Sequence, residues 1–213
     1  MSTKYWFPTF AGKIIDIENP TPDMIDVEDI AQALSMTCRY GGHCRDYYSV
    51  AEHSLGVEAL GYYSTSQTPD YSVRALALLL HDSAEAYLGD VVSPLKRLLG
   101  HPYADLEHRW LRAIEEKFDL GSALTNPDPL VKTCDLAILP VEIVNLCSPP
   151  HPDWWLKIDP PTVGQLSEHS IECLSPSAAR RRFLNRFRHL QWARGPSYRE
   201  TWSGERSESG GAK

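Results

Sequence analysis

A strongly apolar stretch of this chain runs directly into side chains that can bind a metal ion. Residues 75–80 (ALALLL) are all apolar, and His81 and Asp82 come immediately after them. Glu85 follows one helical turn later, and Asp90 stands five residues beyond it. Burying an imidazole and three carboxylates without partners is costly, or it shifts their protonation. A cation is the simplest shared partner, and neutral imidazole with carboxylate suits a divalent transition metal.

Two residues from other parts of the chain could complete this metal site. His53 and Asp135 each lie among apolar residues that repeat at helical spacing. We therefore expect His53, His81, Asp82 and Asp135 to converge from three separate helices. Such a set would leave open positions for a water and a phosphate oxygen, and the metal would lower the pKa of that water. On spacing alone, His53 and Asp135 are equally compatible with hydrogen-bonded core residues.

The remaining charged residues could act on a substrate held at this metal. His81 and Glu85 are four residues apart, so a helix would place them on one face, where Glu85 could hold or deprotonate the attacking water. Asp90 could assist proton transfer from the loop that follows. Three basic residues are candidates for binding a substrate phosphate: Arg39, Lys96 and Lys132. On residue type alone, the two lysines would more often be ordinary surface residues.

The elements that must position these side chains are mostly helical. Residues 5–18 predict a short β-hairpin that turns at Ala11-Gly12. Capping signals predict several helix starts: Asp26 or Asp29 for the first helix, Asp128-Pro129 and Ser175-Pro176 for two later ones, and a capping box in which Ser49 is followed by Glu52. The expected helices are residues 26–36, 49–60, 70–88, a short one from 93, 103–118, 129–147 and 176–192. We therefore predict a mostly α fold, a helical bundle with a short N-terminal β-hairpin.

Length and composition bound the function. The 213 residues fit a single domain, which we place at 1–192, followed by a flexible tail at 193–213. The proline- and aromatic-rich residues 148–164 are interpreted as an ordered lid or rim loop. The net charge of −7 argues against a nucleic-acid partner. No apolar run reaches the length of a membrane span, and the N-terminus lacks the features of a signal peptide. The five cysteines show no C-x-x-C spacing. We therefore expect a cytoplasmic protein with free thiols.

These residues together resemble the HD-domain metal-dependent phosphohydrolases. That family carries a separated His, an adjacent His-Asp pair and a distant Asp, as His53, His81-Asp82 and Asp135 stand here. The chain is most similar to the branch of 5′-deoxynucleotidases and their phage-encoded relatives, which include dATP triphosphohydrolases. The similar stretches, which fall within about residues 12–147, are 29–31 (DIA), 38–43 (CRYGGH), 48–54 (YSVAEHS), 81–85 (HDSAE), 89–90 (GD) and 93–96 (SPLK).

The resemblance implies an HD-domain fold and hydrolysis of 2′-deoxynucleotides at the α-phosphate. It implies one divalent transition metal, Co²⁺, Mn²⁺ or Zn²⁺, and allows a second ion, Mg²⁺ or the same metal, on the substrate phosphates. The implied metal ligands are His53, His81, Asp82 and Asp135; the implied catalytic residues are Glu85 and Asp90; the implied substrate-binding residues are Arg39, Tyr40, Lys96 and Lys132. Tyr40 would pack on the sugar, where relatives often carry Trp. Relatives form dimers or larger assemblies, so a homo-oligomer is expected, in the host cytoplasm if the chain is phage-encoded.

Several functions remain open on the sequence. A 5′-deoxynucleotidase and a dATP-type triphosphohydrolase would use the same residues and differ in the cations that lie beyond the α-phosphate. Hydrolysis of alarmones or cyclic dinucleotides is a second enzyme class within the fold. A nucleotide-binding sensor without catalytic activity is a different class, although the complete ligand set together with Glu85 argues against it.

Overall fold

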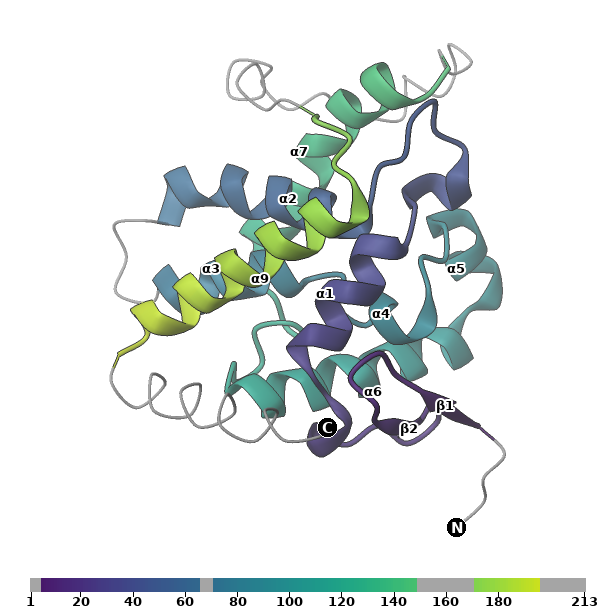
Figure 1. Cartoon of the computed structure of the whole chain (residues 1–213), viewed down its shortest axis with the longest axis vertical. Coiled ribbons are helices and arrows are strands. Elements are labelled where there is room, and N and C mark those ends of the chain that lie inside the picture. Colours follow the sequence, from purple (N-terminus) through teal and green to yellow (C-terminus); the bar gives the residue numbers. More distant parts are fainter. Residues whose placement is uncertain (1–4, 66–70, 149–170, 196–213) are drawn as a thin grey trace, which may run out of the picture.

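Helices make up most of the chain in the computed structural model, which describes residues 5–65, 71–148 and 171–195 (Figure 1). A two-stranded antiparallel hairpin opens it, with β1 (Trp6–Pro8) paired to β2 (Ile14–Asp16). The helices are α1 (Val27–Met36), α2 (Val50–Thr65), α3 (Tyr71–Leu80), α4 (Glu85–Leu88), α5 (Ser93–Leu99), α6 (His101–Phe118), α7 (Pro129–Leu146) and α9 (Pro176–Ala193), with 3₁₀ turns η1 (Pro22–Met24) and η2 (Arg39–Gly42). The predicted mostly α bundle with an N-terminal hairpin is confirmed.

Three helices begin at the predicted caps. The Asp26 carboxylate accepts a hydrogen bond from the Glu28 amide at the start of α1. Asp128 does the same for α7, and Ser175 for α9, each with a proline in the first turn. These caps satisfy amides that have no partner within the helix, which is why the local sequence is enough to predict where the helices begin.

The capping box predicted at Ser49 is only half formed. Ser49 Oγ accepts the Glu52 amide at 3.1 Å, as expected. The Glu52 carboxylate, however, accepts the amides of residues 172–174 at 2.7–3.1 Å. Three amides from a distant loop offer this buried carboxylate more hydrogen bonds than the one amide of the box. Glu52 therefore anchors the chain just before α9 to the start of α2.

The helix predicted over residues 70–88 is wrong in one important respect, because it is interrupted at 81–84. α3 ends at Leu80, and the next amides form tighter i→i+3 bonds, from Ser83 to the Leu80 carbonyl and from Glu85 to the Asp82 carbonyl. The His81 ring also donates from Nδ1 to the Leu78 carbonyl at 2.9 Å, so a side chain competes with the backbone in the last turn of α3. His81 and Asp82 thus lie in a turn, and α4 begins at Glu85.

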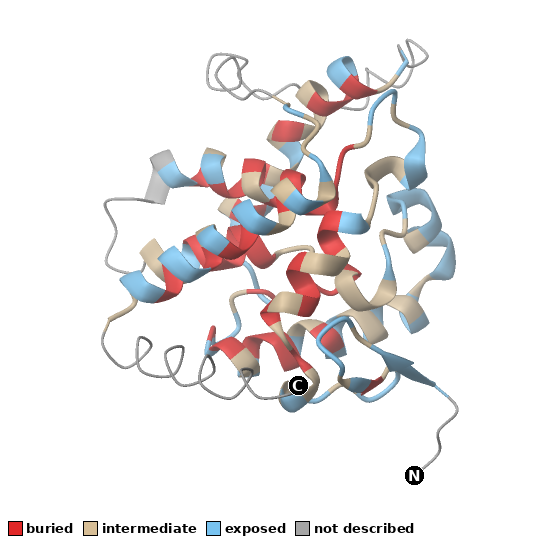
Figure 2. Ribbon diagram, in the orientation of Figure 1, coloured by how far each residue is buried: buried red, intermediate tan, exposed pale blue. Residues whose placement is uncertain are grey.

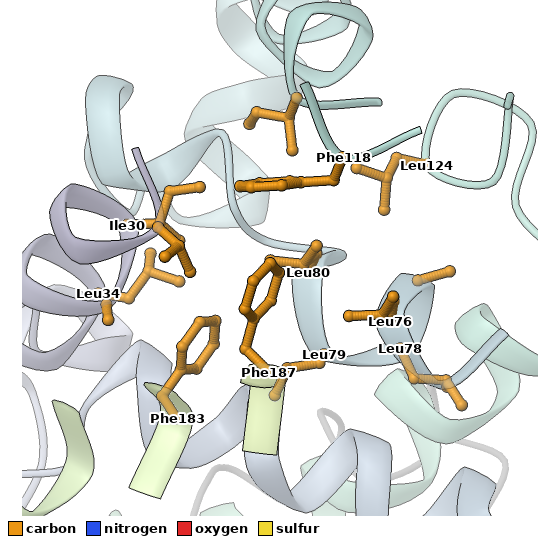
Figure 3. Close-up of a cluster of buried hydrophobic side chains, with 14 of the residues drawn as sticks. Ile30, Leu34, Leu76, Leu78, Leu79, Leu80, Phe118, Leu124, Phe183 and Phe187 are labelled. Atoms are coloured by element: carbon orange, nitrogen blue, oxygen red, sulfur yellow. The ribbon is translucent and has the colours of Figure 1, made fainter. Parts of the chain in front are cut away.

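α3 lies at the centre of the core. Its last six side chains are all buried, and α2 and α9 pack against it (Figure 2). Figure 3 shows Phe183 and Phe187 of α9 among Ile30, Leu34 and the α3 leucines. Phe187 meets Phe118 of α6 edge to face, with the ring centroids 4.9 Å apart. A helix with apolar contacts around its whole circumference is held rigidly, and so is the turn at its end.

Some predictions fall outside the described residues. They concern the lid or rim loop at 148–164 apart from Ser148, the helix start at Asp70, and the tail beyond residue 195. The limits of the predicted domain stay a prediction. Within residues 5–65, 71–148 and 171–195, none of the helices combines the length and apolar character that crossing a membrane requires.

Candidate metal centre

Three side chains predicted as metal ligands, His53, His81 and Asp82, meet between α2 and the turn after α3, and the fourth, Asp135 of α7, contacts His53. The Nε2 atoms of His53 and His81 lie 3.3 Å apart. Asp82 Oδ2 is 3.2 Å from His81 Nε2 and 3.6 Å from His53 Nε2, and these three residues form a compact potential metal site. Asp135 Oδ1 lies 3.5 Å from His53 Nε2, on the α7 side. The predicted convergence of these residues is found in the structure.

Close contact between α2 and α3 brings the two histidines together. Gly61, two turns after His53 on α2, faces Leu78 of α3, and a Cβ at this glycine would lie 2.2 Å from Leu78 Cδ1. A larger residue would therefore separate the helices. His53 is completely buried, and His81 follows directly on α3, so the spacing of these two helices determines the spacing of the two imidazoles.

Hydrogen bonding at the far side of each ring indicates that both Nε2 lone pairs point into the site. His53 Nδ1 lies 2.6 Å from Glu142 Oε1, and His81 Nδ1 lies 2.9 Å from the Leu78 carbonyl. Both partners are acceptors, so each Nδ1 carries the proton. In the neutral rings the two Nε2 lone pairs then face each other and the carboxylates, an arrangement that requires a proton or a cation between them. The donor set fits a divalent transition metal.

The electrostatics of the site support the same conclusion. Burial alone would lower the pKa of His81, but the neighbouring Asp82 carboxylate raises it to about 9. Burial alone would raise the pKa of Asp82, but His81, His53 and Arg39 hold it well below its usual range. His53 and His81 likewise depress the pKa of Asp135 against the effect of burial. The carboxylates therefore remain charged at neutral pH and attract a positive charge.

Arg39 and Tyr40 lie beside the metal centre in η2. Arg39 Nη1 is 3.5 Å from Asp82 Oδ2, and its Nη2 is 3.4 Å from Glu142 Oε2. Glu142 and Asp82 raise the pKa of Arg39 against the effect of burial, so the guanidinium stays charged. Tyr40 has a left-handed backbone, with φ of 58°, and its hydroxyl donates to Glu142 at 2.6 Å. The structure therefore places Arg39 and Tyr40, two of the four predicted substrate-binding residues, within one hydrogen-bonded network with His53.

Glu85 lies at the other side of the site and is held by Lys96. Lys96 Nζ donates to Glu85 Oε1 at 2.9 Å and to Glu107 Oε1 at 2.8 Å. The other Glu85 oxygen is buried without a hydrogen-bond partner among the described residues. Burial and the nearby Asp82 charge raise the pKa of Glu85 to about 8, and burial also raises the pKa of Asp90. Glu85 and His81 do not share one helix face as predicted, because the helix is interrupted between them.

Lys132 is the most exposed of the predicted phosphate-binding residues. It donates to Asp135 Oδ2 at 2.9 Å, while Asp135 Oδ1 faces His53, so the lysine lies at the solvent side of the centre. Arg39 and Lys132 thus contact candidate ligands directly, whereas Tyr40 and Lys96 are linked to the site through Glu142 and Glu85. Their chemical roles stay predictions.

Sequence reasoning missed two residues of the site. Glu142 is completely buried in α7, and Tyr48 donates to its Oε1 at 2.9 Å. A signal for Glu142 was present, because it stands seven residues after Asp135, two helical turns along the same face of a mainly apolar helix. The Tyr48 hydroxyl could not be assigned, because its partner lies 94 positions away along the chain.

Comparison with known proteins identifies relatives without a described function. An uncharacterized protein of Rhodobacter capsulatus is 40% identical over 125 residues, which cover 57% of this chain and 62% of that protein. The uncharacterized protein YfdR of Escherichia coli is 36% identical over 134 residues, which cover 63% of this chain and 68% of YfdR. No family model matches the chain. The chain thus spans about 62% of the length of the Rhodobacter relative.

Proposed function

The chain belongs to the family that includes YfdR of Escherichia coli, and we propose that it is a metal-dependent phosphohydrolase of the HD-domain type that acts on 2′-deoxynucleotides at the α-phosphate. The relatives carry no described function, so support for the proposal comes from the site itself and from the motifs that resemble the 5′-deoxynucleotidases.

One observation carries the proposal: two imidazole Nε2 atoms 3.3 Å apart face the carboxylates of Asp82 and Asp135. His53, His81, Asp82 and Asp135 would hold a divalent transition metal, Co²⁺, Mn²⁺ or Zn²⁺. When bound, that ion would lower the pKa of a water molecule and polarise the phosphorus–oxygen bond. The four ligands leave coordination positions for the water and for a phosphate oxygen.

The surrounding residues would bind the substrate and move protons. Arg39 would bind a phosphate oxygen, because its guanidinium already lies 3.5 Å from Asp82. Lys132 would add a second positive charge from the solvent side. Glu85, whose pKa is raised to about 8, could exchange a proton near neutral pH, which is the property that a general acid or base needs. Asp90 would take the second proton-transfer role, and Tyr40 would pack on the deoxyribose.

Among the described residues, several cations that could bind the further phosphates of a triphosphate are paired with other groups. The basic last helix could have bound the further phosphates of a triphosphate, but four of its arginines pair elsewhere: Arg186 with Glu58, Arg182 with Glu172, and Arg180 and Arg188 both with Glu28. Arg45 binds the carbonyls of Val144 and Cys147 at the end of α7. Lys96 is held by two carboxylates. Arg39 and Lys132, which lie beside the candidate ligands, are paired with carboxylates as well, so these pairings leave both the 5′-deoxynucleotidase and the dATP-type triphosphohydrolase open.

A substrate panel tests the proposal directly. The full chain is incubated with deoxy- and ribonucleoside mono- and triphosphates and with Co²⁺, Mn²⁺, Zn²⁺ or Mg²⁺, and the products are separated chromatographically. Turnover that depends on an added metal ion is the expected result, and deoxynucleoside plus orthophosphate from monophosphates would identify a 5′-deoxynucleotidase. Deoxynucleoside plus intact triphosphate would instead identify a triphosphohydrolase. Adding an alarmone and a cyclic dinucleotide to the panel tests whether the same metal site hydrolyses these substrates instead.

Paired variants show whether turnover arises at this site. Asp82→Ala removes a carboxylate that contacts both histidines and should abolish turnover and metal binding while the circular dichroism spectrum stays helical. Asp105→Ala, an exposed carboxylate on α6, is the matched control and should keep activity. Turnover by Asp82→Ala after metal removal would refute the metal-centred function. Nucleotide binding without turnover under every metal would indicate a sensor.

A further inference from the structure

We propose that Glu142 is a positioning residue that holds His53 in its metal-binding tautomer and ties the metal centre to the substrate-facing residues Arg39 and Tyr40. This inference rests on the proposed metal centre. The motifs discussed above assign no role to Glu142, and its function follows from the groups that surround it.

Glu142 is buried completely and is surrounded by hydrogen-bond donors from two distant segments. Its Oε1 accepts from His53 Nδ1 at 2.6 Å and from the Tyr48 hydroxyl at 2.9 Å. Its Oε2 accepts from the Tyr40 hydroxyl at 2.6 Å and lies 3.4 Å from Arg39 Nη2. A buried carboxylate is tolerated only when it is paired and hydrogen-bonded, and here both oxygens are satisfied. The four donors therefore have their positions specified by one anion.

The first consequence concerns the His53 ring. An acceptor at Nδ1 keeps the proton there and leaves the Nε2 lone pair directed at His81 and Asp82. Without an anion at Nδ1, the ring loses its preference for this tautomer and for this orientation. Carboxylates in this position typically account for ~10–100-fold in metal affinity.

The second consequence concerns the 3₁₀ turn η2. Tyr40 has a left-handed backbone, a conformation that is strained for a residue other than glycine. The bond from its hydroxyl to Glu142 offsets that strain and fixes the aromatic ring. Arg39, which also contacts Asp82, depends on the same carboxylate for its second anion. Metal binding and the order of this turn are therefore linked through Glu142.

The test compares two buried glutamates. Glu142→Gln keeps the size of the side chain but places an amide group among four donors. Glu58→Gln is the matched control, because Glu58 is also buried, pairs with Arg186 and lies on α2, the helix that carries His53. Mn²⁺ affinity is measured by calorimetry on the full chain. Glu142→Gln should bind Mn²⁺ ~10–100-fold more weakly than the wild type, and Glu58→Gln should match it. Equal Mn²⁺ affinity of a folded Glu142→Gln and the wild type would overturn the proposal.

Measuring kcat and KM separately distinguishes a positioning role of Glu142 from simple loss of metal. At saturating Mn²⁺, Glu142→Gln should recover much of its kcat, while KM for the deoxynucleotide stays raised because Arg39 and Tyr40 have lost their anchor. Recovery of both constants would remove the proposed link to the substrate side. A wild type that binds Mn²⁺ but turns over no nucleotide would refute the proposed function and leave the Mn²⁺ titration valid as a test of Glu142.

A measurement on the wild type covers the case in which Glu142→Gln does not fold. In the Zn²⁺-loaded, ¹⁵N-labelled protein, the His53 ring should show a proton on Nδ1 and a metal-coordinated Nε2. Coordination through Nδ1, or a proton on Nε2, would refute the proposal without any substitution.

Discussion

Metal binding should compete with a proton on His81, and this competition gives the metal affinity a defined dependence on pH. Asp82 raises the pKa of His81 to about 9 although burial opposes the shift, so at neutral pH the metal-free site holds a proton where the metal would lie. At pH 7, two units below that pKa, about one molecule in 100 has a free Nε2. The apparent affinity for Mn²⁺ should therefore be about 100-fold weaker at pH 7 than above pH 9, or about 3 kcal/mol.

Proton linkage sets the direction and the pH range of this change in metal affinity. The metal needs deprotonated imidazole, so affinity rises about tenfold per pH unit up to about pH 9 and is constant above it. Calorimetry under nitrogen, in buffers of different ionisation enthalpy, should detect about one proton released per Mn²⁺ bound at pH 7.5. His108→Gln, an exposed position on α6, should preserve this dependence. A pH-independent affinity between 7 and 9, with no proton released, would refute this account of the site.

Three further predictions test the residues around the centre. Burial raises the pKa of Glu85 to about 8, so the folded metal-free protein loses stability as the pH rises from about 4.5 to 8. Glu85→Gln should therefore have a higher Tm than the wild type above pH 8 and the same Tm near pH 4.5. Equal Tm values at both pH values would contradict this. Gly61→Ala would press a methyl group against Leu78 and should lower the free energy of unfolding in urea by ~1–3 kcal/mol; an unchanged midpoint would mean that α2 and α3 separate without strain. Tyr40→Ala should weaken discrimination between deoxy- and ribonucleotides, measured as a ratio of kcat/KM, and an unchanged ratio would place recognition of the sugar elsewhere.

Local signals in the sequence were sufficient for most of the helices and for selecting the candidate metal ligands. Asp26, Asp128 and Ser175 cap the helices they were predicted to cap, because a cap involves only its own helix turn. The four ligands stand out because an imidazole or a carboxylate in an apolar helix needs a partner. Their convergence follows once the helices pack by their apolar faces.

What sequence reasoning missed depends on long-range contacts. Glu142 accepts donors from Tyr40 and His53, residues 102 and 89 positions away. The Glu52 carboxylate binds amides 120–122 positions away instead of completing a local capping box. The interruption after Leu80 was hidden because residues 75–85 have good helical spacing, and the ring of His81 competes with the backbone only once it lies in the folded turn.

Two sets of hydrogen bonds, one at the end of α7 and one just before α9, determine where the chain between these helices can vary in length. Arg45 binds the last carbonyls of α7, and Glu52 holds residues 172–174 just before α9. Glu52 is the neighbour of His53 in the sequence, so the anchor that holds residues 172–174 lies next to the candidate metal centre. Both ends of the connection between α7 and α9 are held by these hydrogen bonds. Insertions or deletions within it would therefore leave the positions of Asp135 and Glu142 unaffected. Changes in length between residues 148 and 171 would therefore leave the four candidate ligands where they are.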